Sequence, residues 1–282
     1  TDNENKKTQT IESDEPTDEA LKPRQREGAN QAPTMLDASP VQQIDSQLNP
    51  HLTFNNYLEG SSNKLTRSIG LSISEHPQMT SFNPFFVFGP SGCGKTHLIN
   101  AMGVETKRMY PEKRVLYISA RLFEVQYTNA VLRNTINDFI NFYQTIDVLI
   151  VDDVQEWEGK TGTQNTFFHI FNHLFRNGKR IILACDRPPV ELKGMNERLI
   201  TRFSSGLIAE MEKPNVQLCA DILRRQIKHD GLNIPEDVIE FIASTANGSV
   251  RELQGVINSL MAYRVVYNCD IEITLSPRHH LP

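Results

Sequence analysis

The chain has 282 residues, of which 39% are hydrophobic and 22% are charged, and its formal net charge is −5. This length is enough for one large α/β domain and a smaller second domain. The charge excludes a global basic field, so any nucleic-acid site must be local, and no apolar run is long enough to span a membrane.

The first 48 residues form a segment of distinct composition. They carry ten acidic and five basic side chains and no aromatic one. Such a segment cannot bury enough apolar surface to offset the entropy lost on ordering. We therefore predict an acidic disordered linker over residues 1–48, with folded structure beginning where Phe54 and Tyr57 follow.

Five short apolar runs alternate with helical stretches between residues 49 and 212. Short, wholly apolar strands separated by helices are typical of a parallel sheet that is covered on both faces. The predicted strands are 85–88, 115–118, 148–151, 181–184 and 207–210, and the predicted helices lie near 95–109, 121–143, 163–177 and 196–204.

From residue 213 onward the pattern is helical only. Helices are predicted at 215–229, 236–246 and 249–266, with Asn247-Gly248 as a break. The sequence thus predicts an α/β domain with a central parallel five-stranded sheet over 49–212 and a small all-helical lid over 213–268. Residues 269–282 are predicted to begin a connector to a further domain.

The cysteines indicate the cellular compartment, and the first residue indicates whether the chain is a fragment. Cys93, Cys185, Cys219 and Cys269 are widely spaced, which fits neither a disulfide framework nor a metal site and suits a reducing cytoplasm. No signal sequence is recognisable. Because the chain starts at Thr1 instead of Met, we expect it to be a fragment of a longer protein.

A phosphate-loop motif follows the first apolar run. The run GPSGCGKT fits the pattern G-x-x-x-x-G-K-[ST] between a strand and a helix. Gly89, Gly92 and Gly94 would let backbone N–H groups approach a triphosphate, and the positive end of the next helix would face it. Lys95 would reach the β- and γ-phosphates, and the Thr96 hydroxyl would hold Mg²⁺. The motif predicts a nucleotide-binding protein.

Two carboxylates end the third predicted strand. An aspartate at the carboxyl edge of a parallel sheet lies beside the Mg²⁺ of a phosphate-loop site. Asp152 is therefore the candidate for the outer coordination sphere of the metal, and Asp153 is the candidate to orient or activate the attacking water. The alternative is a pair of solvated turn aspartates, which the upstream phosphate loop disfavours.

Several separate stretches resemble one known family. They are the GKTHL that ends the phosphate loop and the runs 49–68, 151–210 and 249–260. These stretches resemble the AAA+ domain of the DnaA family of bacterial replication initiators, and the similarity extends from about residue 48 to residue 275.

The resemblance implies roles for four further residues. Asp186 matches the sensor 1 position, which senses the γ-phosphate. Arg202 matches the arginine finger, which reaches the ATP of a neighbouring subunit, and Arg198 matches a second interface arginine. The two arginines are four residues apart and share a helix face. Arg251 matches the sensor 2 arginine, which contacts ATP. A positive charge in the first turn of a helix is electrostatically unfavourable, which is consistent with a role in binding ATP.

The family also implies an activity and partners. The cofactors would be ATP or ADP with Mg²⁺, and the ATP form would oligomerise at the origin, bind and unwind DNA, and be switched off by slow hydrolysis. Partners would be origin DNA (single-stranded through this domain, duplex through a missing one), further copies of the chain, the replicative helicase through a missing domain, and acidic phospholipids. The helical insertion at 121–143 would steer the single strand. The protein would be cytoplasmic and nucleoid-associated.

Two departures from the family pattern weaken parts of this expectation. Gly162 stands where family members commonly carry a basic residue proposed to contact single-stranded DNA. Ser204 and Ser205 replace an aromatic after the arginine-finger motif.

Two rival functions stay open. One is an AAA+ regulator or helicase loader that acts through protein contacts without reading duplex DNA. The other is a small-molecule kinase, which the paired arginines and the helical lid disfavour.

Overall fold

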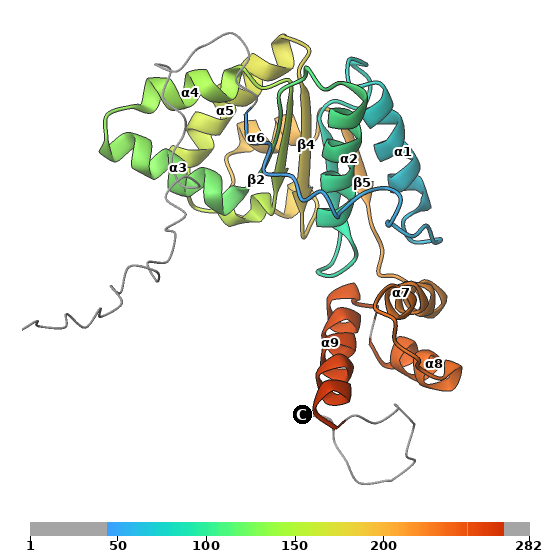
Figure 1. Ribbon diagram of the computed structural model, residues 1–282. Helices are drawn as coiled ribbons and strands as arrows, with labels where there is room; N and C mark the ends of the chain where they lie inside the picture. The colour runs from blue at the N-terminus through green and yellow to red at the C-terminus, as the bar shows by residue number, and fades with distance from the viewer. Residues whose placement is uncertain (1–43, 247, 268–282) are drawn as a thin grey trace, which may run out of the picture.

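The computed structural model describes residues 44–246 and 248–267. The predicted linker up to residue 43 and the predicted connector at 269–282 lie outside the described residues. The described chain forms an α/β core followed by a separate group of three helices (Figure 1).

Five parallel strands form one sheet in the order β2-β3-β4-β1-β5. The strands are β1 (Phe85–Phe88), β2 (Val115–Ser119), β3 (Val148–Asp152), β4 (Arg180–Cys185) and β5 (Leu207–Glu210). The predicted central parallel sheet is therefore confirmed. Because β3, β4 and β1 are neighbours, the loops that follow them emerge side by side at the carboxyl edge, which is where ligands bind in such sheets.

Helices cover both faces of the sheet (Figure 1). One face carries α1 (Lys64–Glu75) and α2 (Lys95–Met109), and the other carries α3 (Ala120–Leu132), α4 (Ile136–Gln144), α5 (Thr161–Arg176) and α6 (Glu197–Phe203). Alternate strand residues point to opposite faces. Phe85 and Ile150 accordingly pack in the core under α2, whereas Phe86 and Val151 pack with the second group of helices.

Two helices differ from the sequence prediction. No helix was predicted at α1, because only Ile73 among its four fully buried residues is large and apolar, and the other three, Thr66, Gly70 and Ser74, are small or polar. The predicted stretch 121–143 is divided into α3 and α4 by a turn, in which Asn134 has a φ of 57°. Asparagine tolerates this left-handed conformation better than most residues.

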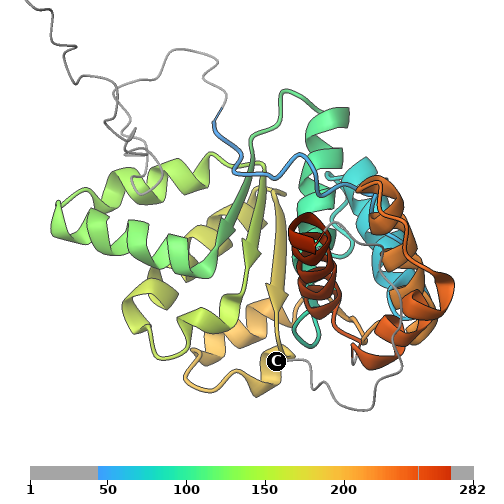
Figure 2. The same cartoon turned by 60° about the horizontal axis from the view of Figure 1, so that its bottom comes forward.

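The last three helices are α7 (Val216–His229), α8 (Glu236–Thr245) and α9 (Val250–Tyr267). They enclose a small apolar core of their own, in which Leu223, Ile239 and Leu253 are buried. This group is the predicted helical lid. Figure 2 views α9 nearly along its axis in front of the core, and Figure 1 shows α9 below the core, where the N–H of Val250 at its start bonds the carbonyl of Gly92 in the phosphate loop. Within the described residues, no helix is both long and apolar enough to cross a membrane.

The chain ahead of α1 is fastened to the sheet and to α2. The backbone N–H of Tyr117 donates to the carbonyl of Ser46 (2.9 Å) at the outer edge of β2, and Leu48 packs on the core under α2. Residues 44–48 therefore lie against the fold, although the prediction placed them in the linker. Ile44 and Leu48 make the apolar contacts of this segment. The composition did not predict these contacts, because the residues around the two are polar.

Asn100 of α2 makes the next attachment. Its Oδ1 accepts from the backbone N–H of Asn49 (2.9 Å), and its Nδ2 donates to the carbonyls of Asn49 (2.8 Å) and Leu52 (2.9 Å). The side chain is only 2% exposed. Since buried polar groups must be paired, these three bonds fix residues 49–52 on the surface of α2.

Replacing Asn100 by alanine is expected to lower the free energy of unfolding by about 2 kcal/mol, because the attached segment loses three hydrogen bonds to one buried side chain. Urea denaturation followed by circular dichroism measures this change. Asn177→Ala is the matched control, since Asn177 is exposed and its side chain bonds, among the described residues, only the carbonyl of His173. A stability equal to that of the parent in Asn100→Ala would contradict this role.

Candidate nucleotide-binding site

The phosphate loop joins the end of β1 to the start of α2. A Cβ on Gly89 would lie 2.2 Å from the carbonyl oxygen of Met211, so no larger residue fits there. Gly92 has a φ of 80°, which glycine adopts without strain. The helix begins at Lys95 directly after Gly94, so its free N–H groups and positive dipole end face the loop. The predicted phosphate loop therefore has the backbone that anion binding requires.

Lys95 is folded back over this loop. Its side chain is 8% exposed, and its Nζ donates to the carbonyl oxygens of Gly89 (2.7 Å) and Pro90 (3.0 Å). No acidic side chain pairs with it in the described ranges. A buried ammonium that is bonded only to carbonyls keeps its positive charge available for a phosphate.

Asp152 and Thr96 meet beside the loop. The hydroxyl of Thr96 donates to Oδ2 of Asp152 (2.7 Å), and the hydroxyl of Tyr117 donates to the same oxygen (2.9 Å). The backbone N–H of Asp153 donates to Oδ1 (3.0 Å). Burial and the charge of Asp153 raise the pKa of Asp152, and the two hydroxyl donors oppose this rise. Tyr117 was not among the predicted site residues, and its only sequence signal is a hydroxyl within the apolar run 115–118.

The oxygen atoms of Thr96 and Asp152 fit a magnesium ion. Mg²⁺ prefers oxygen ligands, keeps several waters and takes further oxygens from phosphates, so one or two protein groups suffice. Among the described residues, no group of three or more His, Cys, Asp or Glu side chains could hold a metal ion. The hydroxyl of Thr96 and the carboxylate of Asp152 thus supply two oxygen donors to a cation that takes its other ligands from water and phosphate.

Asp153 and Asp186 lie at the ends of neighbouring strands. Asp153 has φ 56° and ψ 48°, the left-handed conformation. Asp186 is bonded to the guanidinium of Arg187 through both carboxylate oxygens (2.8 and 2.9 Å), and this pairing lowers the pKa of Asp186. Gln155 bridges the two aspartates. Neither Gln155 nor Arg187 was among the predicted site residues.

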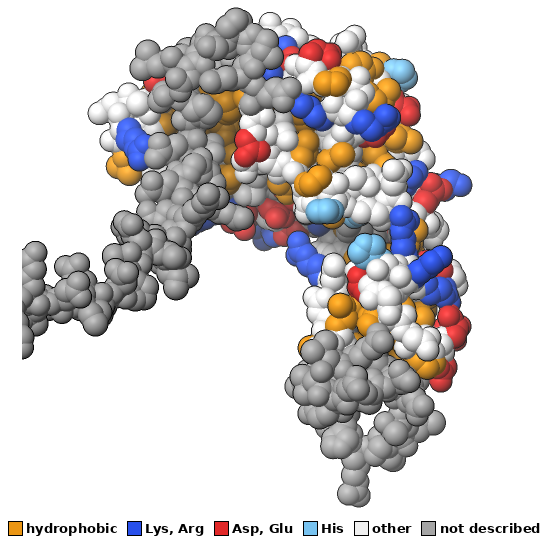
Figure 3. Space-filling model, viewed as in Figure 1, with side chains coloured by type: hydrophobic (Ala, Val, Ile, Leu, Met, Phe, Trp, Pro, Cys, Tyr) orange, Lys and Arg blue, Asp and Glu red, His pale blue; other side chains and the backbone are white. Residues whose placement is uncertain are grey.

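The lid touches the loop through the start of α9. Nη1 of Arg251 donates to the hydroxyl of Ser91 (2.9 Å), and the N–H of Val250 donates to the carbonyl of Gly92 (3.1 Å). Ser249 accepts from the N–H of Glu252 (3.4 Å), which is the main half of the predicted capping box. The structure thus brings Arg251 to the phosphate loop, where acidic and basic side chains face the hollow between core and lid (Figure 3).

Arg198 and Arg202 are not joined to the phosphate loop by any hydrogen bond in the described residues. Arg198 lies 4.8 Å from the ring centroid of Phe168, and its Nη2 donates to Asn165 Oδ1 (3.3 Å). Arg202 has no hydrogen-bonded or ion-paired side-chain partner in the part of the chain that is described, and Ser205 Oγ donates only to its backbone carbonyl (2.7 Å). The structure therefore does not bring these two arginines together with the other predicted site residues.

Gly162 packs closely against the α3–α4 hairpin. A Cβ there would lie 2.6 Å from the hydroxyl of Tyr127, so a basic side chain at this position would have to displace that ring. The neighbouring Lys160 is paired with Glu124 on α3 (2.9 Å). This surface presents less free positive charge than the family pattern would provide.

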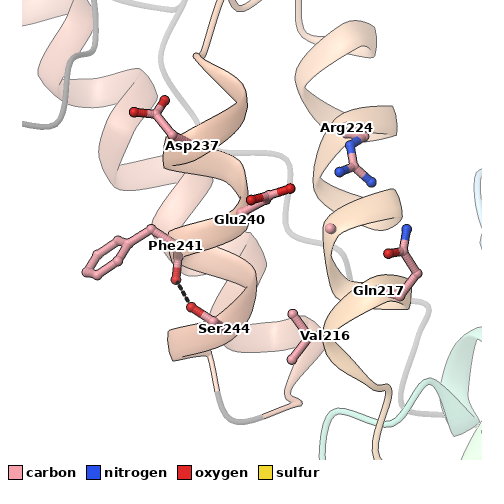
Figure 4. Close-up of a pocket in the computed structure, with 8 residues that line it drawn as sticks. Val216, Gln217, Arg224, Asp237, Glu240, Phe241 and Ser244 are labelled. Atoms are coloured by element: carbon pink, nitrogen blue, oxygen red, sulfur yellow. Dashed lines mark hydrogen bonds between the residues drawn. The ribbon is translucent and has the colours of Figure 1, made fainter.

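A groove of about 490 Å³ lies elsewhere, between α7 and α8 (Figure 4). Val216, Arg224 and Glu240 line it, and Phe241 at its rim is 55% exposed. It contains none of the predicted site residues.

The strand order, with the loop after β1 bonded to a helical lid, defines the class of the protein: it is a nucleotide-binding domain of the AAA+ type. Residues 48–210 match the family model of the bacterial DnaA ATPase domain. The chain belongs to the DnaA family.

Individual relatives agree with this assignment. The chromosomal replication initiator protein DnaA of Bacteroides thetaiotaomicron is 54% identical over 257 residues, which is 91% of this chain and 55% of that protein. Domain III of DnaA from Thermotoga maritima has a TM-score of 0.77 at 33% identity, covering 80% of this chain and 94% of the other. A DnaA bound to AMPPCP and single-stranded DNA has a TM-score of 0.71 at 36% identity, covering 76% and 66%. The chain thus spans about half the length of the full-length relative.

Proposed function

We propose that this chain is the ATP-dependent switch of a chromosomal replication initiator. The observation that carries the proposal is the convergence of Lys95, Asp152 and Arg251 on one phosphate loop, in a chain of the DnaA family. ATP and ADP are the ligands, because the loop offers the anion-binding backbone and the lysine that a polyphosphate needs. The lid senses the bound nucleotide through Arg251.

The residues divide the work as follows. Lys95 binds the β- and γ-phosphates, and Thr96 with Asp152 would hold Mg²⁺, which neutralises phosphate charge when it is bound. Asp153 orients the attacking water, and Asp186 senses the γ-phosphate. Hydrolysis is slow and serves to reset the switch, so the protein is a weak ATPase whose nucleotide is mainly a conformational ligand.

Arg202 acts on a neighbouring copy. Its guanidinium has no polar side-chain partner in the described part of its own chain, and arginine is suited to gripping phosphate oxygens. A head-to-tail contact of this kind is heterologous and need not close, so repeated copies build a filament. Arg198, held against Phe168, lies one helical turn away on the same interface.

The remaining roles are those of the whole protein. We assign to it the opening of origin DNA, duplex recognition through a segment beyond this chain, contacts with the replicative helicase and with acidic phospholipids, and a place on the nucleoid in the cytoplasm. The α3–α4 hairpin would steer the single strand through the assembled filament.

This chain is expected to bind single-stranded DNA in preference to origin duplex, and only with ATP. Binding should be modest, because Gly162 supplies no charge and Lys160 is paired with Glu124. It should also weaken steeply between about 50 and 200 mM salt, since contacts with phosphates dominate. Fluorescence anisotropy with single strand, origin duplex and scrambled duplex, each in ATP and in ADP, measures these differences.

Two results would count against the proposal. Nanomolar preference for origin duplex would mean that the duplex reader lies within this chain. Complete absence of ATP-dependent binding to single strands, with ATP itself bound, would instead favour a regulator that acts through protein contacts.

A further inference from the structure

Gln155 links the two aspartates that end β3 and β4. It lies in the 3₁₀ turn η2 (Val154–Trp157), which directly follows Asp153. Its Nε2 donates to Oδ1 of Asp153 (3.0 Å), and its Oε1 accepts from the backbone N–H of Asp186 (3.3 Å). A carboxamide has one donor end and one acceptor end, and here each end meets its complement.

Asp153 needs such a support. Its backbone is left-handed, a conformation that most residues with a Cβ avoid and that aspartate adopts as a single residue in a defined turn, so the direction of its carboxylate depends on that turn. The turn that carries Gln155 is itself fixed, because Trp157 is 0% exposed and its Nε1 donates to the carbonyl of Ala120 (2.8 Å). Gln164 holds the same turn by donating to the carbonyl of Trp157 (2.7 Å).

We infer that Gln155 is a positioning residue for ATP hydrolysis, an inference that rests on the function proposed above. In that reaction the water oxygen forms a bond to the γ-phosphorus while the bond from that phosphorus to the β–γ bridging oxygen breaks, which yields ADP and inorganic phosphate. Asp153 orients the water and accepts its proton, which then passes to the phosphate. Gln155 sets the direction of the Asp153 carboxylate and ties it to the strand end at which Asp186 meets the γ-phosphate.

The bridge also gives an optical readout. Trp157 is the only tryptophan of the chain and lies two residues after Gln155 in the same turn. If Gln155 joins the γ-phosphate end of the site to this turn, ATP should change the emission of Trp157 in a way that ADP does not.

The test compares the parent with Gln155→Met, which keeps the length of the side chain but lacks both hydrogen bonds, and with Gln155→Glu. The glutamate keeps an oxygen that can accept from Asp186 N–H, loses the donor to Asp153 and adds a like charge beside it. Gln217→Met on α7 is the control, because Gln217 is exposed and its side chain bonds only Asp221 within the described part of the chain. Single-turnover hydrolysis, ATP and ADP affinities, thermal unfolding and Trp157 emission are measured for each protein.

Gln155→Met and Gln155→Glu should both hydrolyse ATP about tenfold more slowly than the parent. A displaced Asp153 carboxylate would provide only part of the rate enhancement that a well-placed general base gives. Their affinities for both nucleotides and their melting temperatures should equal those of the parent. The ATP-specific change in Trp157 emission should disappear in Gln155→Met.

Two results would overturn the inference alone: a parent-like rate in Gln155→Met, or a rate loss accompanied by equal losses of ADP affinity and of thermal stability. The second result would show that Gln155 only supports the fold. A parent that binds no ATP would instead contradict the proposed function, and the inference would fall with it.

Discussion

Alanine at Lys95 is expected to reduce ATP affinity about 100-fold while leaving the fold intact. The ammonium makes charge-assisted hydrogen bonds with the phosphates, and the loss of such bonds costs about 3 kcal/mol, which corresponds to two powers of ten in affinity. The fold should tolerate the change because the present partners of Lys95 are two loop carbonyls, which water can reach once the side chain is removed. Titration with a fluorescent ATP analogue measures the affinity.

Lys64→Ala is the matched control for this variant. Lys64 carries the same charge, but its side chain is 73% exposed and lies near Glu59 on the surface. It should bind ATP as the parent does. Unchanged ATP affinity in Lys95→Ala would remove the basis for assigning the loop to a nucleotide, whereas a large drop in its melting temperature would show that the carbonyl contacts are structural.

Arg202→Ala is expected to bind ATP like the parent but to lose ATP-dependent assembly. The finger acts on the nucleotide of another copy, so its removal should leave affinity within each subunit unchanged and weaken the contact between subunits about tenfold or more. Light scattering across a range of protein concentrations with a non-hydrolysable ATP analogue measures the assembly.

Arg108→Ala serves as the control for assembly. Its guanidinium is exposed on α2 and pairs with Glu105 in its own helix, so its loss removes one positive charge without touching the proposed interface. Equal assembly by Arg202→Ala and the parent would count against the finger. Loss of ATP affinity in Arg202→Ala would place this arginine in the site of its own chain.

The parts of the fold that the sequence predicted are those with strong local signals. The five strands are short apolar runs between helices. The GPSGCGKT motif is typical of a loop between a strand and a helix, so β1, the loop and α2 could all be predicted from the sequence. Asp152 beside Thr96 follows from one further rule, that neighbouring parallel strands end at the same edge. Helix α1 was not predicted, because three of its four fully buried residues are small or polar.

The contacts that the sequence could not predict depend on side chains distant along the chain. Tyr117 reaches Asp152 only because β2 and β3 pair in a register that sets Ser119 opposite Asp152. The bond from Gln155 to the backbone of Asp186 needs β3 and β4 side by side, and no pattern in either segment signals it. The pattern of apolar residues predicts which segments form strands and helices. Hydrogen bonds between distant side chains depend instead on how those strands and helices pack together.

The attachment of residues 49–52 by Asn100 has a mechanical consequence. Along the chain, Ser46 is bonded to the rim of the sheet, residues 49–52 to the nucleotide-binding helix, and the carbonyl of Asn55 to Nη2 of Arg225 on the lid (2.6 Å). These anchors are in series. A pull on the chain ahead of residue 44 would therefore load the sheet edge first, then α2, and last the lid, so tension reaches the lid only after the first two attachments break.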